Sequence, residues 1–163
     1  LYRCFAEMRL PGEGGHELVV INSHMSAYDE GGTIRAQQLE LLNSVIAEEY
    51  AKGNYVIVGG DFNHAMGEEV AEGFPSEQKF PEWVAVLTDE DLTDGVRIVR
   101  ADNELEVPTC RGADIVYTKG VNYTTVVDGF LVTDNVRATA ENIDTDFAYS
   151  DHNPVKLQFE LIK

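Results

Sequence analysis

The sequence predicts an α/β fold with a mixed sheet, and three observations support this prediction. Residues 2–10 alternate between apolar and polar side chains, and residues 17–22 return after a glycine-rich turn, which predicts an antiparallel hairpin. Residues 33–52 carry apolar side chains at helical spacing. Residues 55–58 are a short apolar run, as is typical of a strand buried on both faces. A strand, a helix and a strand in this order form a crossover, which is the mark of an α/β layer.

Length and composition predict one domain, spanning residues 1–163. The chain is long enough for a real core, and its 44% hydrophobic and 25% charged content is ordinary for a soluble globular protein. It contains no apolar run long enough to span a membrane. Because Leu1 lies inside a strand-like pattern, we expect the chain to be a piece of a longer protein. Neither a targeting segment nor a compartment can be read from it.

The formal net charge is −17, from 29 acidic and 12 basic residues. This balance argues against a broad surface that follows nucleic-acid phosphates, because such surfaces depend on lysine and arginine. It does not exclude a nuclease, since a divalent cation can neutralise a phosphate locally. The two cysteines, Cys4 and Cys110, are too few for a disulfide framework, and Cys4 is expected to be buried on its strand.

The helix over residues 33–52 has clear start and stop signals. Thr33 can cap its first turn, and Gly53 follows its last. Its apolar stripe is formed by Leu41, Leu42, Val45 and Ile46.

The second half of the chain is predicted to contain more strands and one short helix. Residues 80–87, with Pro81 near the start, predict the helix, in which Trp83 anchors the preceding acidic loop. Further strands are predicted at residues 123–132, 136–143 and 155–161.

Polar side chains stand at the end of the 55–58 strand. After Gly59 and Gly60, where the backbone can turn sharply or approach a ligand closely, come Asp61 and Asn63. Ligands of open α/β sheets sit outside the carboxyl ends of strands, so both side chains are candidates for a site. The alternative is that they cap a turn.

Three other segments carry polar side chains next to strands. His24 ends the second strand of the hairpin, Asp128 interrupts an apolar run, and Asp151 and His152 precede the last strand within Ser150-Asp151-His152-Asn153-Pro154. A buried Asp128 would need a partner. The alternatives are a strand-end histidine bonded to a carbonyl for His24, and a simple turn for the last segment.

In this order, the four signatures resemble the second half of the endonuclease/exonuclease/phosphatase superfamily, which has the deoxyribonuclease-I-like fold. The resemblance extends from about Arg3 to Leu161. It implies part of a four-layer α/β/β/α sandwich with a mixed, largely antiparallel sheet. The first half of that family carries an asparagine and a glutamate that bind the catalytic metal. We therefore expect a C-terminal portion that lacks the first strands, with an incomplete metal site and weak or no activity of its own.

The resemblance also implies roles for single residues. His24 would contact the scissile phosphate, and the His152–Asp128 pair would act there as base or oxyanion stabiliser. Asp151 would contribute to the metal site. As a carboxylate, Asp61 would orient or deprotonate the attacking water.

The remaining candidates concern the metal and the substrate. Asn63 would hold a water or a phosphate oxygen, and together with Asp61 and Asp151 it offers oxygen ligands, for which Mg²⁺ or Mn²⁺ is expected. Zinc would need more histidine or cysteine. Arg111 could bind a substrate phosphate or balance local acid. His64 is interpreted as a loop residue.

The predicted function is therefore hydrolysis of a phosphate ester by a metal-dependent phosphoesterase. Nucleic acid, a phospholipid head group and a small phosphate ester all remain open as substrates, although the charge does not favour nucleic acid. The alternative is a catalytically inactive interaction module with the same fold. An acidic calcium-binding domain ranks low because the spacing of a calcium loop is missing. Exposed sheet edges could also let the chain associate with itself.

Overall fold

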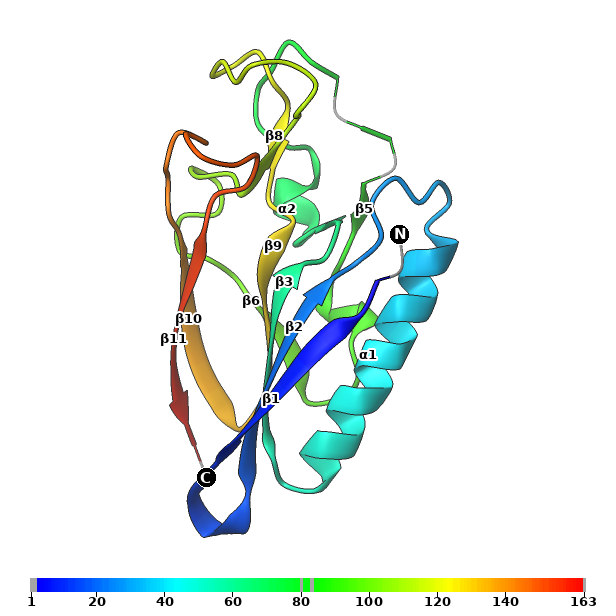
Figure 1. The fold of residues 1–163 in the computed structure, drawn as a ribbon, viewed down its shortest axis with the longest axis vertical. Helices are drawn as coiled ribbons and strands as arrows, with labels where there is room; N and C mark the ends of the chain where they lie inside the picture. Colours follow the sequence, from blue (N-terminus) through cyan, green and yellow to red (C-terminus); the bar gives the residue numbers. More distant parts are fainter. Residues whose placement is uncertain (1–2, 80, 83, 163) are drawn as a thin grey trace.

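A five-stranded sheet is the centre of the fold, which we describe from a computed structural model covering residues 3–79, 81–82 and 84–162. The order of its strands is β1-β2-β3-β9-β6 (Figure 1). The first pair and the last two pairs are antiparallel, whereas β2 and β3 are parallel, which confirms the predicted mixed, largely antiparallel sheet. The strands are β1 (Phe5–Pro11), β2 (Glu17–His24), β3 (Tyr55–Asp61), β9 (Asp128–Thr133) and β6 (Val96–Val99).

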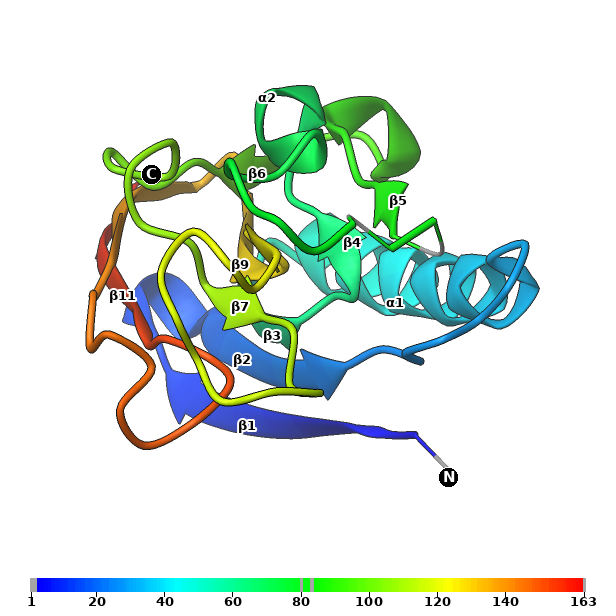
Figure 2. The ribbon, with the colours of Figure 1, turned by 90° about the horizontal axis from the view of Figure 1, so that it is seen from above.

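The helix α1 (Thr33–Ala51) connects β2 to β3 and covers one face of the sheet (Figures 1 and 2). This confirms the predicted crossover. Leu42 and Ile46 are buried against the sheet, but Leu41 is 57% exposed. The predicted apolar stripe is therefore wrong at Leu41, because the buried face follows the four-residue spacing of Leu42 and Ile46.

The ends of α1 match the predictions only in part. Gly53 follows the helix with φ of 81°, as a terminating glycine should. At the other end, Thr33 does not act as the cap, because Gly32 occupies the N-cap position without a side-chain cap bond. The Asp29 carboxylate accepts the backbone N–H of Arg35 instead, at 2.8 Å.

A second, two-stranded sheet covers the other face of the central sheet. It consists of the antiparallel strands β10 (Val136–Asn142) and β11 (Val155–Leu161), close to their predicted bounds. Apolar side chains from β3, β9, β10 and β11 form a core between the two sheets. A separate core fills the space between the central sheet and α1. The described residues thus form a helix layer and two sheet layers, as in part of the predicted sandwich (Figure 2).

Short elements complete the fold at the end where β2 and β3 terminate. The pairs β4 with β5 and β7 with β8 form two small sheets beside the turns and the short helix α2. Their bounds are β4 (His64–Ala65), β5 (Ala85–Val86), β7 (Cys110–Arg111), β8 (Thr124–Thr125) and α2 (Glu68–Ala71). Two other short elements lie elsewhere: η1 (Glu13–Gly15) joins β1 to the start of β2, and η2 (Asp89–Asp91) precedes β6.

Two predicted elements differ from the structure. The strand predicted at residues 123–132 is divided into β8 and β9, because the carbonyls of Val126 and Val127 accept N–H groups from the segment after β3. The helix predicted at residues 80–87 is wrong at Ala85–Val86, which form β5 beside β4. Residues 80 and 83, and with them the expected role of Trp83, lie outside the described residues.

Both cysteines are free thiols. Cys4 is exposed, so its predicted burial is wrong, and Cys110 is partly buried. Among the described residues, no helix is long and apolar enough to cross a bilayer.

Candidate active site

Three of the predicted side chains stand in a row across the central sheet. The strand register places His24 of β2 opposite Asp61 of β3, and Asp61 opposite Asp128 of β9. Gly60 permits this close approach of β2 and β3, since a Cβ atom there would collide with the carbonyl oxygen of Ser23. The parallel strands therefore bring their terminal polar residues together at one edge of the sheet.

Asp61 is the centre of this row. Its Oδ2 lies 3.2 Å from Nε2 of His24, and its carboxylate accepts the backbone N–H of Asn63 at 2.8 Å. Burial, followed by the negative charge of Asp128, raises the pKa of Asp61 above its usual value. The Asp61 carboxylate is thus a partly buried hydrogen-bond acceptor next to the His24 imidazole.

His152 joins the row from the loop before β11. Its Nδ1 lies 2.8 Å from Oδ2 of Asp128, and its Nε2 lies 3.9 Å from Oδ2 of Asp61. The hydrogen bond to Asp128, and next a contact with the Cys110 thiol, raise the pKa of His152 to about 11. At neutral pH this imidazole is therefore positively charged, with Nδ1–H donated to Asp128.

Thr109 holds the backbone near Asp128 and near His152 in place. Thr109 is fully buried, and its hydroxyl oxygen accepts the N–H groups of Val127 and Asp128 at 3.0 and 3.1 Å. Its carbonyl accepts the N–H of Asn153 at 2.8 Å, beside His152. Sequence reasoning missed this role, because β7 is too short to give a periodic signal.

The other candidates lie around the row. Asn63 is buried in a left-handed turn with φ of 49°, and its amide donates to the carbonyl of Met25 at 3.0 Å. Asp151 and Arg111 belong to the wall of the cleft. His64 is buried with Nδ1 2.7 Å from the carbonyl oxygen of Phe62, and burial lowers its pKa.

The row opens into a cleft of about 610 Å³, which is large enough for a small ligand. Its walls come from the loop after β2, from residues 78–79 and 81–82, and from the loop between β7 and β8. Tyr28 and Tyr123 belong to these walls, and sequence reasoning did not single out either of them.

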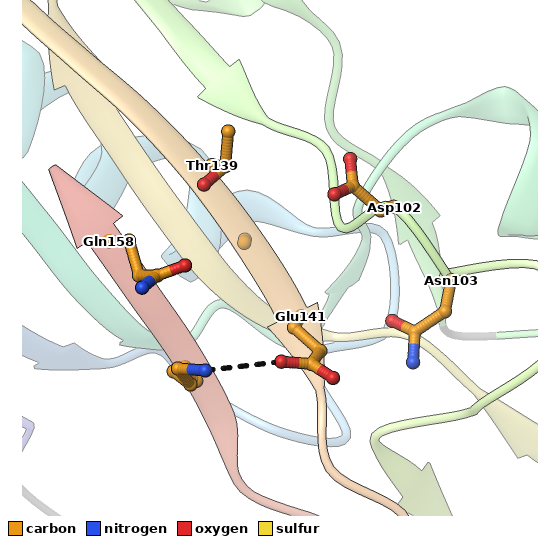
Figure 3. A pocket seen from close by; sticks show the side chains of 7 residues that line it. Asp102, Asn103, Thr139, Glu141 and Gln158 are labelled. Atoms are coloured by element: carbon orange, nitrogen blue, oxygen red, sulfur yellow. Dashed lines mark hydrogen bonds and ion pairs between the residues drawn. The ribbon is translucent and has the colours of Figure 1, made fainter.

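Another cavity lies on the β10–β11 sheet and has a different character. It measures about 350 Å³, and its walls are mainly polar (Figure 3). Lys156 and Glu141 form an ion pair of 3.3 Å across it. None of the four predicted site segments contributes to its lining, so the cleft around Asp61 remains the candidate active site.

The row also contains the ligand types that a metal ion needs. Among the described residues, one ligand atom each from Asp61, Asp128 and His152 lie within 4.8 Å of one another. The two carboxylates offer the oxygen ligands that fit Mg²⁺ or Mn²⁺, whereas the positively charged His152 carries a proton on each ring nitrogen and has no lone pair for a metal ion. Asp151 and Asn63, which were also expected to bind the metal, border the cleft outside this group.

The layers, the mixed sheet and the topology define a deoxyribonuclease-I-like fold, so the fold expected from the sequence resemblance is confirmed. No protein-family model matches the sequence, and no curated protein matches it.

Solved structures with this fold cover nearly the whole chain. Truncated TDP2 from Caenorhabditis elegans matches 97% of this chain with 20% identity and a TM-score of 0.60, over 60% of its own length. TDP2 from D. rerio, complexed with a single-strand DNA product, matches 97% with 16% identity and a TM-score of 0.59, over 62% of its length. An endonuclease/exonuclease/phosphatase family protein from Bacteroides thetaiotaomicron matches 96% with 17% identity and a TM-score of 0.57, over 56% of its length. The chain thus spans less than two thirds of each of these structures.

Proposed function

We propose that this protein is a divalent-metal-dependent phosphoesterase that hydrolyses a phosphodiester or phosphomonoester by attack of water. The observation that carries the proposal is the convergence of the His24–Asp61 and His152–Asp128 pairs at one cleft. Hydrolysis of a phosphate ester needs an oriented water, stabilised phosphoryl oxygens and a stabilised leaving oxygen. These two pairs offer a group for each need. The likeness in fold to the structures named above also supports hydrolysis of a phosphate ester.

Each side chain of the row has a chemical task in this proposal. His152, charged and oriented by Asp128, donates Nε2–H to a phosphoryl oxygen, which favours its role as oxyanion stabiliser over that of base. His24 is half exposed and donates to the phosphate or protonates the leaving oxygen. Asp61 accepts a hydrogen bond from the attacking water and orients it. Arg111 at the cleft wall adds positive charge for the substrate.

The ligands of the metal are Asp61, Asp151 and Asn63 in this proposal. When bound, Mg²⁺ or Mn²⁺ supplies positive charge to the phosphoryl oxygens and a more acidic water. Asn63 is buried and Asp61 is partly buried, and both border the cleft together with Asp151.

We further propose that residues 1–163 are the C-terminal portion of an endonuclease/exonuclease/phosphatase domain. The support is that the chain spans 56% to 62% of the similar structures named above. Further metal ligands, an amide and a carboxylate, then come from the remainder of the domain. The DNA product in the D. rerio TDP2 structure supports a nucleotide-type substrate, whereas the net charge of −17 disfavours a long polyanion.

Hydrolysis assays test the proposal. The substrates are bis(4-nitrophenyl) phosphate, DNA, RNA, sphingomyelin and phosphoinositides, each with Mg²⁺, with Mn²⁺ and with EDTA. They are given to residues 1–163 and to a longer polypeptide that contains them. We expect EDTA-sensitive hydrolysis by the longer polypeptide. Hydrolysis that survives EDTA contradicts the metal requirement, and no hydrolysis of any substrate favours an interaction module.

A further inference from the structure

Two tyrosines occupy the walls of the cleft next to the row of catalytic side chains. We propose that Tyr28 and Tyr123 form a ring-binding subsite, which takes the nucleobase of a mononucleotide or of a short single strand whose phosphate reacts at Asp61 and His152. This inference rests on the phosphoesterase function proposed above and adds the substrate class.

The first observation is the conformation of Tyr28. The residue is 76% exposed, borders the cleft and has a φ of 54°. Bulky residues rarely adopt this left-handed backbone, and such outliers gather where function requires a fixed side-chain position. A large ring held out toward a cleft in this way is a surface on which a flat ligand can stack.

The second observation is that the Tyr28 loop is fastened from below. The Asp29 carboxylate accepts the N–H of Arg35 at 2.8 Å, and the Asp29 carbonyl accepts the N–H of Gly32 at 2.9 Å. Arg35 is 1% exposed, and the N–H of Ser26 donates to the side chain of Gln38 at 2.9 Å. Because the segments before and after Tyr28 are fixed, its unusual backbone is maintained in the folded protein.

The third observation is the anchoring of Tyr123 on another wall. Its N–H donates to the side-chain oxygen of Gln78 at 3.0 Å, and its carbonyl accepts the N–H of Gly112 at 2.9 Å. Burial, with smaller effects from groups that include Cys110 and Tyr28, raises the pKa of Tyr123 to about 12. The Tyr123 phenol therefore keeps its proton at neutral pH, and Tyr123 borders the same cleft as Tyr28.

The size and charge of the cleft agree with a base attached to a phosphate. The volume of about 610 Å³ exceeds what a phosphate alone needs. Glu82 and Asp114 offer acceptors for the amino and imino groups of a base, while Lys79 and Arg111 offer positive charge for phosphates. The acidic chain favours one or a few nucleotides over a duplex, because a long polyanion would need many positive contacts.

A pair of substrates with the same leaving group tests the subsite. Thymidine 5′-(4-nitrophenyl phosphate) and methyl 4-nitrophenyl phosphate share the leaving group and differ in the nucleoside, which carries the base that the tyrosines would hold. We expect Tyr28→Ala to lower the ratio of their kcat/KM values about tenfold to a hundredfold, as is typical of losing one stacked base. Tyr28→Phe keeps the ring and should keep the ratio. Tyr149→Ala is the matched control, because Tyr149 is 96% exposed and lies outside the cleft lining.

A backbone effect is separated from a ring effect by Tyr28→Gly. Glycine adopts a φ of 54° without strain, so this variant should keep the melting temperature of the wild type. It lacks the ring, so its ratio of kcat/KM values for the two esters should fall as in Tyr28→Ala. Equilibrium binding gives a readout that does not need turnover: thymidine 5′-monophosphate should bind more tightly than inorganic phosphate, and Tyr28→Ala should remove the difference.

The outcomes separate this inference from the proposed function. Suppose that both esters are hydrolysed and that Tyr28→Ala and Tyr123→Ala leave the ratio of their kcat/KM values unchanged. This result overturns the subsite and leaves the phosphoesterase proposal intact. An equal affinity of the wild type for the monophosphate and for inorganic phosphate also overturns the subsite. Failure of the longer polypeptide to hydrolyse either ester, together with tight binding of the monophosphate, counts against the phosphoesterase and supports the subsite.

Discussion

At the scale of single residues, His152 is the group whose chemistry depends most on its neighbours. Its ring is 31% exposed, so its removal should disturb packing little. Without it, a phosphoryl oxygen loses a charged donor, and turnover of the longer polypeptide should fall about 10²- to 10⁴-fold in His152→Ala. Asp128→Asn should have a milder effect. The measurement is kcat at saturating metal, with a melting curve as the folding control; a fully active His152→Ala would contradict the mechanism.

Thr109 affects the same pair without contacting the substrate. Thr109→Val leaves the N–H groups of Val127 and Asp128 without their buried acceptor, which should cost about 2 kcal/mol of unfolding free energy or more. Because Asp128 would shift, kcat should fall more than KM changes. Thr109→Ser keeps the hydroxyl and should restore kcat. Urea unfolding and steady-state kinetics on the three proteins check this, and an unaffected kcat in the valine variant would limit Thr109 to a role in stability.

The predictability of single site residues depended on where they stand. Asp61 follows a strand with a clear apolar pattern, so its place at the sheet edge could be anticipated from the pattern. His24, Asp128 and His152 were brought to the same site by the resemblance to the endonuclease/exonuclease/phosphatase superfamily, and the structure places them beside Asp61. Tyr28 lies in a loop whose conformation is fixed by hydrogen bonds such as that between Asp29 and Arg35. The sequence pattern does not predict these bonds, so the role of Tyr28 could not be predicted from it.

At the scale of elements, α1 provides a comparison between adjacent leucines. Leu42 is 1% exposed and Leu41 is 57% exposed, although the sequence assigned both to the apolar stripe. Leu42→Ala should destabilise the fold by about 2–5 kcal/mol, whereas Leu41→Ala should change the free energy of unfolding by less than about 0.5 kcal/mol. Urea unfolding of the two variants decides this, and equal losses would contradict the orientation of the helix.

Element prediction succeeded where one side-chain period ran for a whole segment. β10, β11 and α1 fall within one residue of their expected bounds. The strand predicted at residues 123–132 failed, because the divided segment satisfies its carbonyls with distant N–H groups of Phe62 and Met66. Such long-range partners outweigh local pattern.

The Glu49 carboxylate at the end of α1 binds Arg9 of β1 and Lys52, and this contact makes the stability of the fold depend on pH. Glu49 lies within 2.9 Å of Arg9 and 2.7 Å of Lys52, and its hydrogen bond with Arg9 is the main cause that lowers its pKa from 4.5 to about 2. Since the folded-state pKa is lowered, this stabilisation is present above about pH 4.5 and is lost as the pH falls toward 2.

Glu49→Gln should remove that pH dependence. The variant should lose about 1–2 kcal/mol of unfolding free energy at pH 7, a value reduced by solvent screening around the exposed partners. At pH 2 the free energies of unfolding of the wild type and of Glu49→Gln should become nearly equal. Urea unfolding across this pH range checks the prediction, with Glu48→Gln as the control because Glu48 is 72% exposed; parallel curves for wild type and Glu49→Gln would contradict it.

At the scale of the whole molecule, the two sheets differ in extent. The central sheet has five strands, whereas β10 and β11 form a sheet of two, so the second layer covers only part of the first. β1 is an edge strand, and Met8 and Leu10 on it are 53% and 41% exposed. The exposed apolar face and the open strand edge of β1 are the features that favour pairing with another strand.

Residues 1–163 alone should therefore associate with themselves in a concentration-dependent way. An antiparallel pairing of two β1 strands centred on Met8 would place Glu7 of each copy opposite Arg9 of the other, which is a complementary arrangement for a two-fold dimer. Met8→Lys places like charges at the centre and should weaken association at least about tenfold. Leu105→Lys is the control, because Leu105 is similarly exposed, at 59%, but lies outside the strands. Sedimentation equilibrium of the three proteins measures the effect; a monomer at every concentration, or equal weakening by both lysines, would show that the β1 edge does not pair.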